Sequence, residues 1–400
     1  LMENLIKRCK RLLDVTSTDY IRGLMNVIHW DVRLVAIRGA RGVGKTTLML
    51  QYLKLHYSSD CKEAIYVSLD NPYFTRHTLE EFVDLFYLHG GKHLFLDEVH
   101  KYPDWSREIK SIYDGYPGLR IVFSGSSLLQ ILNVEADLSR RCISYEMQGL
   151  SFREFLKLSY KIDVPPFSLD EILESPDSIC SRINALCRPL AYFDEYLQKG
   201  YYPFVFEGGS EYYSRIENVV NMILEMELPQ QCGVDPGNAR KLKTLLTILS
   251  TEVPMMFDMT KLSLMAGMPR STILTYLHHL NRAKLIHLLY SDLSSLKKMQ
   301  KPDKIYMENP NLLYVLSLEE VNKGTLREVF MVNQLSYQHQ VEYCTRSADY
   351  TVDGRYVIEV GGKAKDGKQI AKKQKAFIAA DNIDYPVGNK IPLWLFGFLY

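Results

Sequence analysis

The amino-acid sequence predicts an α/β fold with a parallel sheet in its N-terminal part. Two observations predict it. The first is a short apolar strand, a glycine-rich loop and a helix, which follow one another directly over residues 34–53. The second is a series of further apolar segments between helical ones, at residues 64–69, 93–98 and 119–123. Strands that alternate with helices over short connections favour a doubly wound parallel sheet.

The loop after the first strand has the pattern Gly39-x-x-x-x-Gly44-Lys45-Thr46, which is typical of a phosphate-binding loop. Its glycines let backbone N–H groups point inward at a phosphate, and the helix N-terminus adds partial positive charge. Lys45 is expected to reach the outer phosphates, and Thr46 to place its hydroxyl on Mg²⁺. The predicted nucleotide-binding residues of this loop are Gly39, Ala40, Arg41, Gly42, Val43, Gly44, Lys45, Thr46 and Thr47.

Two carboxylates, Asp97 and Glu98, end the apolar segment at 93–98. We expect Asp97 to support the Mg²⁺ through its water shell, and Glu98 to orient and polarise an attacking water. Strands also end in acidic turns for purely structural reasons. Because this pair follows a phosphate-binding loop by about fifty residues, the catalytic interpretation is favoured.

A small polar cluster, Ser124-Gly125-Ser126-Ser127, follows the segment at 119–123. Ligands of parallel α/β sheets lie at the carboxyl ends of the strands, so Ser124 or Ser126 is expected beside the nucleotide, where a hydroxyl can sense the γ-phosphate. The alternative is an N-cap for a helix at 127–132, and one serine can serve both roles.

The phosphate-binding loop, the stretch Leu96-Asp97-Glu98-Val99-His100 and the serine cluster resemble those of the prokaryotic AAA-like ATPases of the archaeal-ATPase type. The stretches at 137–141 and 149–156 strengthen the resemblance, although Arg140 stands where the family has a glycine. The resemblance implies that Arg141 approaches the γ-phosphate, in its own subunit or from a neighbouring one. A surface ion pair of Arg141 with Glu146 or Glu154 is the alternative.

The resemblance also implies a domain order that spans nearly the whole chain. The family usually continues with a helical segment, a winged helix and a C-terminal domain similar to PD-(D/E)XK nucleases. The expected parts are an ATPase core at 1–150, a helical lid or connector at 151–240, a winged helix at 241–310 and a small nuclease-like α/β domain at 311–400.

The segment at 241–310 also predicts a helix-turn-helix from its own residues. Ala266 and Gly267 fit the corner, and the second helix begins with the exposed polar residues Arg270, Ser271, Thr272 and Thr275. Residues 285–289 and 304–307 are expected to pair as a wing with Lys297, Lys298, Lys301 and Lys304 at its tip. Such lysines suit a DNA backbone, but these units also dock proteins or serve only as structure, so both kinds of partner stay open.

The last ninety residues resemble the PD-(D/E)XK core, with a helix at 366–379 and a closing strand at 392–399 expected from the pattern. In that family a helix Glu, a strand Asp and a Glu-x-Lys collect around Mg²⁺. Glu328, Asp349 and Glu359 match these positions, but Gly361 replaces the lysine, and Lys363 is the first candidate to replace it. We therefore expect a degenerate domain with at most weak metal binding and no robust nuclease activity.

Composition narrows the class of protein. The chain has 400 residues, of which 46% are hydrophobic and 24% charged, and its formal net charge of +1 neither supports nor excludes nucleic-acid binding. No apolar run approaches the roughly 20 residues that span a bilayer, so no membrane partner is expected. The seven cysteines form no C-x-x-C pair, which predicts reduced thiols in a cytoplasmic protein.

These observations predict a Mg²⁺-dependent ATPase in which Lys45, Glu98 and Arg141 are catalytic and the nucleotide state acts on the winged helix and the nuclease-like domain. Two alternatives remain. The first is a nucleotide-gated adaptor for DNA or protein with little turnover, and the second is a DNA nuclease under ATP control. The missing lysine at position 361 argues against the nuclease.

Overall fold

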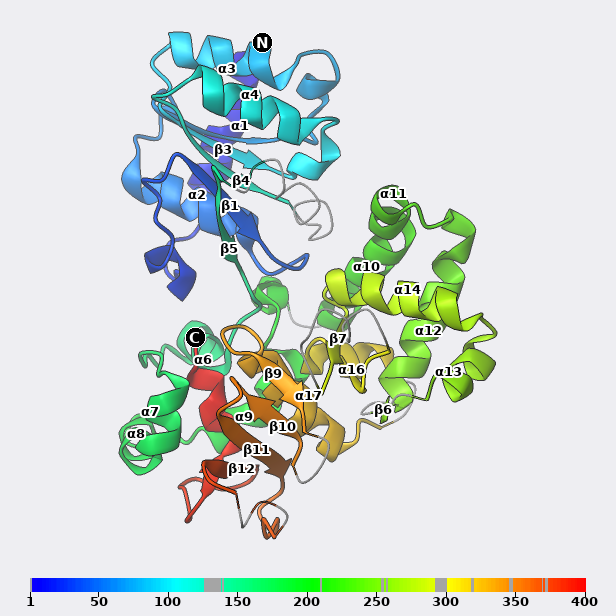
Figure 1. Ribbon diagram of the computed structural model, residues 1–400. Helices are drawn as coiled ribbons and strands as arrows, with labels where there is room; N and C mark the ends of the chain where they lie inside the picture. The colour runs from blue at the N-terminus through cyan, green and yellow to red at the C-terminus, as the bar shows by residue number, and fades with distance from the viewer. Residues whose placement is uncertain are drawn as a thin grey trace. The chain divides into compact units, whose positions relative to one another are not determined.

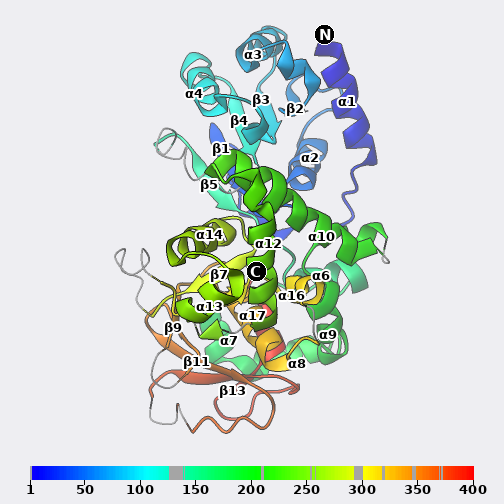
Figure 2. The same ribbon diagram turned by 90° about the vertical axis from the view of Figure 1, so that its right-hand side faces the viewer.

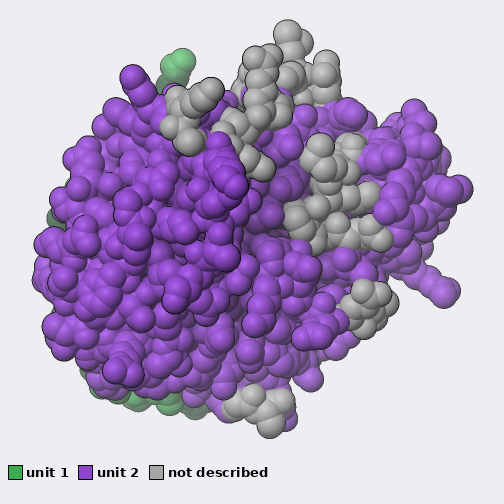
Figure 3. All heavy atoms as spheres, turned by 90° about the horizontal axis from the view of Figure 1, so that it is seen from below, with its two compact units in different colours: residues 1–149 green, residues 150–400 purple. Residues whose placement is uncertain are grey.

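The chain folds into two compact units, residues 1–149 and residues 150–400, which Figure 3 distinguishes by colour. The computed structural model describes residues 2–125, 138, 140–208, 211–252, 255–256, 258–291, 301–317, 320–344, 348–368, 370 and 373–400. All seven cysteines are free. None of the helices in these ranges is long and apolar enough to cross a membrane.

Unit 1 is built on a five-stranded sheet in the order β2-β3-β4-β1-β5, in which all neighbouring strands are parallel. This confirms the predicted parallel α/β sheet. The strands are β1 (Leu34–Arg38), β2 (Ala64–Ser68), β3 (His93–Asp97), β4 (Arg120–Ser124) and β5 (Ile143–Glu146).

Burial explains which of these strands the sequence reveals. Strands β1 to β4 are almost completely buried, although β2 is an edge strand, and their apolar runs stand out in the sequence. The edge strand β5 is only partly buried and its Ile143 is 42% exposed, so Ile-Ser-Tyr-Glu gives no clear strand signal and was not predicted.

Helices cover both faces of this sheet, with α1 and α2 on one side and α4 on the other (Figure 2). The chain runs from β1 across the sheet to β2 through α2, and returns to β3 and β4 through α3 and α4. Because crossovers between parallel strands are right-handed, the two directions place these helices on opposite faces. The helical elements of unit 1 are α1 (Met2–Val15), η1 (Gly23–Asn26), α2 (Lys45–His56), η2 (Pro72–Thr75), α3 (Leu79–Leu88), η3 (Val99–Lys101) and α4 (Trp105–Gly115). The predicted helix at 127–132 lies outside the described residues.

Unit 2 begins with a run of helices over the predicted connector. Its first helix starts at a capping box, in which the Ser151 hydroxyl accepts from the Glu154 N–H and the Glu154 carboxylate accepts from the Ser151 N–H. The capping box explains why a serine and a glutamate stand three residues apart in the stretch 149–156, which strengthens the family resemblance. The helices are α6 (Phe152–Tyr160), α7 (Leu169–Glu174), α8 (Pro176–Asn184), α9 (Leu190–Lys199), η4 (Pro203–Glu207), α10 (Tyr212–Met222), the π-helical η6 (Ile223–Glu227), α11 (Leu228–Cys232) and η7 (Pro236–Asn238).

Three helices and a small sheet follow. The helices are α12 (Ala239–Glu252), α13 (Met259–Ala266) and α14 (Arg270–Arg282), and each one contacts the next along the chain (Figure 1). Gly267 caps α13 with φ 61°, a conformation that favours glycine. Strand β8 (Lys304–Met307) pairs antiparallel with β7 (Ile286–Leu289) and with β6 (Met255–Met256), so the expected pairing of 285–289 with 304–307 is present.

The C-terminal part carries α16 (Pro310–Leu316), α17 (Lys323–Leu335) and a second five-stranded sheet in the order β13-β12-β11-β10-β9. Strands β9 to β11 form antiparallel pairs, whereas β11, β12 and β13 are parallel. The strands are β9 (Val341–Tyr343), β10 (Tyr350–Val352), β11 (Tyr356–Gly361), β12 (Ala376–Ala380) and β13 (Lys390–Pro392).

Two predictions for this part are wrong. The expected helix at 366–379 is absent from the described residues there, because 376–380 forms β12, and Lys368, Lys373 and Lys375 before it are exposed and not helical. The expected closing strand at 392–399 is the 3-10 helix η8 (Leu393–Phe398). All six of its residues are buried, so the apolar run has no period that separates a strand from a helix.

Candidate nucleotide-binding site

The glycine-rich loop connects β1 to the first turn of α2 and has the backbone of a phosphate cradle. Gly44 caps α2 with φ 101°, and Gly39 has φ 151°. A Cβ on Gly39 would lie 2.2 Å from the Met147 carbonyl oxygen, so only glycine fits there. The buried Lys45 Nζ donates to the carbonyl oxygens of Gly39 and Ala40, at 2.8 and 2.7 Å. The lysine ammonium is therefore held over the loop in which a phosphate is expected.

Asp97, at the end of β3, joins three strands to this loop. The Thr46 hydroxyl on α2 donates to Asp97 Oδ2 at 2.6 Å, and the Tyr66 hydroxyl on β2 donates to the same oxygen at 2.7 Å. The Ser124 hydroxyl on β4 and the Glu98 N–H donate to Oδ1. Burial and the neighbouring Asp97 raise the pKa of Tyr66, so its hydroxyl keeps its proton and remains a donor.

Glu98 follows Asp97 in a left-handed backbone conformation, with φ 52° and ψ 37°. Such a conformation is strained for a residue other than glycine, and strain of this kind is typical of functional sites. The Glu98 side chain is 24% exposed, and its Oε2 lies 3.4 Å from Nε2 of the buried His100. The turn after β3 therefore directs Asp97 to the phosphate loop and Glu98 to a separate position, where it contacts His100.

The pKa of His100 is lowered to about 3, first by burial and then by the charges of Lys101, Lys45 and Arg41. Its imidazole is therefore neutral near pH 7. The contributions of Arg41 and Lys45 also show that this ring lies near the phosphate-binding loop.

Ser124 lies at the carboxyl end of β4, between the ends of β1 and β3, as its predicted site role requires. It is completely buried and bonded to Asp97, so in this structure it supports that carboxylate. Ser126, the other predicted serine, lies outside the described residues.

Arg141 does not lie at the phosphate-binding loop of its own chain. It precedes β5, whose Ile143 is opposite Val35 at the start of β1, whereas the loop follows the other end of β1. The strand separates the two by about 13 Å, at about 3.3 Å per residue. The Arg141 guanidinium instead forms a two-bond ion pair with Asp114, at 3.1 and 3.2 Å. The expected role in its own subunit is therefore not supported, and a role in a neighbouring subunit stays a prediction.

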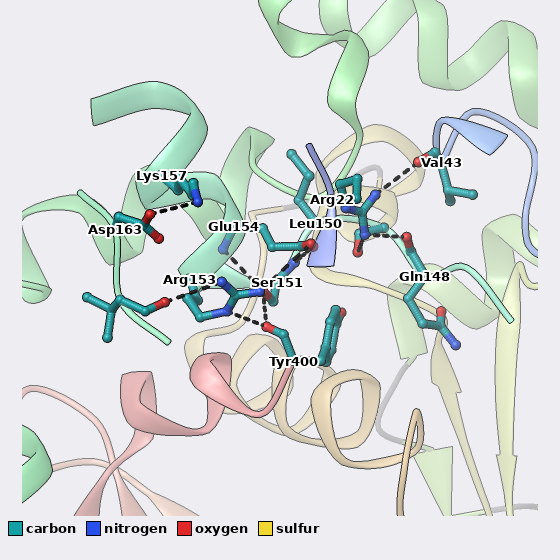
Figure 4. A network of polar contacts seen from close by, with 12 residues as sticks. Arg22, Val43, Gln148, Leu150, Ser151, Arg153, Glu154, Lys157, Asp163 and Tyr400 are labelled. Atoms are coloured by element: carbon teal, nitrogen blue, oxygen red, sulfur yellow. Dashed lines mark hydrogen bonds and ion pairs between the residues drawn. The ribbon is translucent and has the colours of Figure 1, made fainter. Parts of the chain in front are cut away.

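A buried arginine that was not predicted, Arg22, links the phosphate-binding loop to the end of unit 1 (Figure 4). Its guanidinium donates to the Val43 carbonyl at 3.1 Å and to the carbonyls of Gln148 and Gly149 at 2.8 and 2.9 Å. The Met147 N–H also bonds to the Arg38 carbonyl at the start of the loop. The residues that lead into unit 2 are thus bonded to both sides of the loop.

The donor set at this site fits Mg²⁺. The Thr46 hydroxyl oxygen and the Asp97 carboxylate are hard oxygen donors and lie 2.6 Å apart. In the described residues no cluster of three or more histidine, cysteine, aspartate or glutamate side chains is arranged to hold a metal by itself. A magnesium ion would therefore need oxygen ligands from the nucleotide and from water.

The three predicted carboxylates of the C-terminal part lie in one region, and two of them, Glu328 and Glu359, are paired with lysines. Lys304 Nζ lies 2.7 Å from Glu328 Oε2, and Lys365 Nζ lies 2.8 Å from Glu359 Oε1. Burial raises the pKa of Asp349, and the charge of Glu328 raises it further. The two lysines place positive charge next to Glu328 and Glu359, which lowers the net negative charge of this region.

Lys365, and not the predicted Lys363, is the lysine that lies beside Gly361 and Glu359. Lys363 is exposed, whereas the stem of Lys365 lies over Gly361, so a Cβ on Gly361 would be only 2.9 Å from it. Lys304 was expected at a wing tip but is buried in β8 with Glu328 as its partner. Of the other predicted wing lysines, Lys301 is exposed, and Lys297 and Lys298 lie outside the described residues.

Tyr66, His100 and Arg22 are the site residues that were not assigned from the sequence. His100 had a signal, because it is a polar residue just after the two carboxylates and within the resemblance motif. Tyr66 and Arg22 had none, since their contacts to Asp97 and to residues 148–149 depend on strand order and chain path.

Comparison with known proteins supports a P-loop ATPase of the AAA type in the N-terminal part. Residues 31–156 match the family AAA_14, an AAA domain, and residues 190–322 match DUF8612, a domain of unknown function. Each match covers about a third of the chain. The parallel sheet with its phosphate-binding loop fits this class, and the first match supports ATP binding and hydrolysis.

Two proteins of Methanocaldococcus jannaschii are similar along most of the chain. MJ1637 is 24% identical over 381 residues, which are 88% of this chain and 80% of that protein. MJ1544 is 23% identical over 336 residues, which are 80% and 71%. Both are described as uncharacterized proteins.

Similarity to solved structures is weak. A Saccharomyces cerevisiae Hsp104–ADP complex aligns with a TM-score of 0.24 and 16% identity, over 70% of this chain and 39% of that chain. Caenorhabditis elegans PCH-2 aligns with a TM-score of 0.24 and 16% identity, over 40% and 46%. This chain thus covers less than half of either structure.

Proposed function

We propose that this chain is a Mg²⁺-dependent ATPase in which Glu98 activates the attacking water and Asp97 supports the metal. The observation that carries the proposal is the pair of contacts around β3. Asp97 is bonded to Thr46 of the phosphate-binding loop, while the adjacent Glu98 occupies a separate position and remains partly exposed. One carboxylate can thus support the metal while the other activates the water, which are the two separate roles in ATP hydrolysis.

In the proposed reaction the loop N–H groups and Lys45 bind the phosphates. The oxygen of a water attacks the γ-phosphorus while Glu98 accepts its proton, and the bond from the γ-phosphorus to the bridging oxygen breaks, so that ADP and phosphate form. Thr46 and Asp97 would hold Mg²⁺, which neutralises negative charge on the phosphates when it is bound. Tyr66 and Ser124 keep Asp97 oriented through their hydroxyl donors.

The proposal includes a route from the nucleotide to unit 2. Arg22 bonds Val43, in the phosphate-binding loop, to Gln148 and Gly149, the last two residues of unit 1. A shift of the loop when it binds phosphate therefore changes the contacts of the segment that leads into unit 2. The proposed winged helix and nuclease-like domain lie within that unit.

Two further features support the finer parts of the proposal. The order of α12, β6, α13, α14, β7 and β8 supports a winged helix at 241–310. The sheet β9–β12 after α17 supports a degenerate PD-(D/E)XK-like domain at 311–400 that does not cut DNA, because lysines neutralise two of its carboxylates. The kind of partner, DNA or protein, stays a prediction, since one of the four expected wing lysines is buried.

The nucleotide-binding part is tested with Lys45→Ala in the full chain. We expect a fluorescent ATP analogue to bind about 10- to 100-fold more weakly, because a charge-assisted hydrogen bond contributes about 1.5–3 kcal/mol. Lys54→Ala is a matched control, since Lys54 is on the same helix but bonds to the Thr16 carbonyl. Equal affinities of Lys45→Ala and Lys54→Ala would contradict the proposed site.

A further inference from the structure

The buried His100 contacts the side chain of the proposed catalytic base. Its ring is 1% exposed, and its Nε2 lies 3.4 Å from Glu98 Oε2. We propose that His100 is a positioning residue, which holds the Glu98 carboxylate in the orientation it needs to accept a proton from the attacking water. This inference rests on the proposed ATPase function.

The backbone alone does not set the position of the Glu98 carboxylate. The left-handed turn at Glu98, together with the bond from its N–H to Asp97, fixes where the side chain begins. The carboxylate is three rotatable bonds further on, and part of the side chain is exposed to water. A buried, rigid ring at the end of this side chain restricts those rotations, and such restriction raises the fraction of time that a base is aligned with its substrate.

Histidine suits this position because it is neutral there. Burial holds the pKa of His100 near 3, so its ring adds no charge next to Glu98 near pH 7. A neutral imidazole whose Nε2 carries the hydrogen offers that N–H to the Glu98 carboxylate. A lysine or arginine at the same place would stabilise the ionised carboxylate and weaken it as a proton acceptor.

The location of His100 also separates positioning from simple packing. His100 lies in η3, directly after β3 and Glu98, and the charges of Lys45 and Arg41 act on it. His93 offers the contrast. It is equally buried and its pKa is also lowered to about 3, but it lies at the other end of β3, where its Nδ1 contacts the Tyr57 hydroxyl at 2.9 Å.

The test compares His100→Leu, His100→Gln and the control His93→Leu in the full chain. We expect His100→Leu to lower kcat on the order of 10- to 100-fold, because a small misplacement of a reacting group has effects of this size. The affinity for a fluorescent ATP analogue should stay within about twofold, since the phosphate-binding contacts remain. His100→Gln should restore most of the lost turnover, because its amide offers an N–H donor at a similar reach.

Double variants with Glu98→Gln give a readout that a structural role would not change. If His100 acts through Glu98, His100→Leu costs no further turnover once Glu98→Gln is present. His93→Leu should lower thermal stability and leave kcat within about twofold in either background.

Three results would overturn the inference. His100→Leu retains wild-type kcat, His100→Gln is as slow as His100→Leu, or the loss in His100→Leu is the same in the Glu98→Gln background. Failure of the proposed function looks different, because Glu98→Gln would then hydrolyse ATP at the wild-type rate whatever stands at position 100.

Discussion

At the scale of single residues, the site depends on polar groups that are buried in fixed protonation states. Asp97 accepts bonds from three hydroxyl groups on three different elements, so its position is determined by the packing of unit 1. His93 and His100, near the two ends of β3, are both buried and both have a pKa lowered to about 3. The same burial that orders the site therefore makes unit 1 sensitive to acid.

The pH dependence of stability follows from the direction of these pKa shifts. In the unfolded chain both histidines bind protons below about pH 6.5, whereas in the folded chain they stay neutral down to about pH 3. Their contribution to stability is complete above pH 6.5 and is lost as the pH falls from 6.5 towards 3. Between pH 7 and pH 5 each histidine should lower the free energy of unfolding by about 2 kcal/mol.

Urea unfolding of wild type and His93→Leu at both pH values measures this contribution. Trp30 and Trp105 report on unit 1. The pH-dependent loss should be smaller by about 2 kcal/mol in His93→Leu, because one titrating group is gone. Equal losses in the two proteins would show that His93 does not stay neutral in the folded state.

Among the elements of the C-terminal part, two lysines form ion pairs with two of the predicted carboxylates. Lys304 comes from β8 and reaches Glu328 on α17, while Lys365 comes from the loop after β11 and reaches Glu359 on that strand. The Tyr306 hydroxyl also donates to Glu328, at 2.8 Å. The contacts of Lys304 and Tyr306 join β8 to helix α17.

Removal of both lysines should expose the underlying carboxylates. We expect the wild-type chain to show no heat of Mn²⁺ binding from this region in calorimetry and no DNA cleavage in Mg²⁺ or Mn²⁺. The double variant Lys304→Met/Lys365→Met should gain Mn²⁺ binding, because uncompensated carboxylates favour a hard divalent cation. DNA cleavage by the wild-type chain that Glu359→Ala abolishes would refute the degenerate-domain interpretation.

Elements also differ in how far the sequence predicts them. The loop at 39–47 and the helix after it were predictable because a strand followed by a Gly-x-x-x-x-Gly-Lys-Thr pattern is a local signal for both. The strand β12 and the 3-10 helix η8 were not. Ala376–Ala380 becomes a strand by pairing with β11 and β13, and Leu393–Phe398 is buried on all sides. Both depend on contacts between segments distant in the sequence.

The same limit applies to the site. Lys45, Thr46, Asp97 and Glu98 lie in two motifs whose spacing the sequence shows, and the structure brings Thr46 and Asp97 within hydrogen-bond distance. The position of Arg141 required the direction of β5, which its sequence did not reveal. That Lys365 rather than Lys363 is the lysine beside Gly361 could not be predicted, because it depends on the path of the loop after that glycine.

For the molecule as a whole, we propose that nucleotide binding acts on unit 2 through the last residues of unit 1. Arg22 provides the bonds from the phosphate-binding loop to Gln148 and Gly149 (Figure 4). Past this segment, Ser151 and Arg153 of unit 2 donate to the backbone oxygen of Tyr400, at 2.7 and 2.8 Å. The start of α6 is therefore tied to the last residue of the C-terminal part.

Hydrogen exchange measures this connection directly. ATP with Mg²⁺ should change the exchange rate of backbone amides at 147–152 in the wild-type chain. Arg22→Ala should reduce that change while ATP still binds, because the three carbonyl contacts are gone. Lys54→Ala serves as the control and should keep it. An unchanged ATP response in Arg22→Ala would exclude this route.

The central claim, that Glu98 is the base of an ATP-hydrolysing site, is tested most directly by ATP turnover in Glu98→Gln. Glutamine fills the same space but is a poor proton acceptor. We expect this variant to bind ATP with wild-type affinity and its kcat to fall by about 100-fold or more, since general base catalysis contributes about 10²- to 10⁴-fold. Wild-type turnover in Glu98→Gln, with ATP binding intact, would contradict the account.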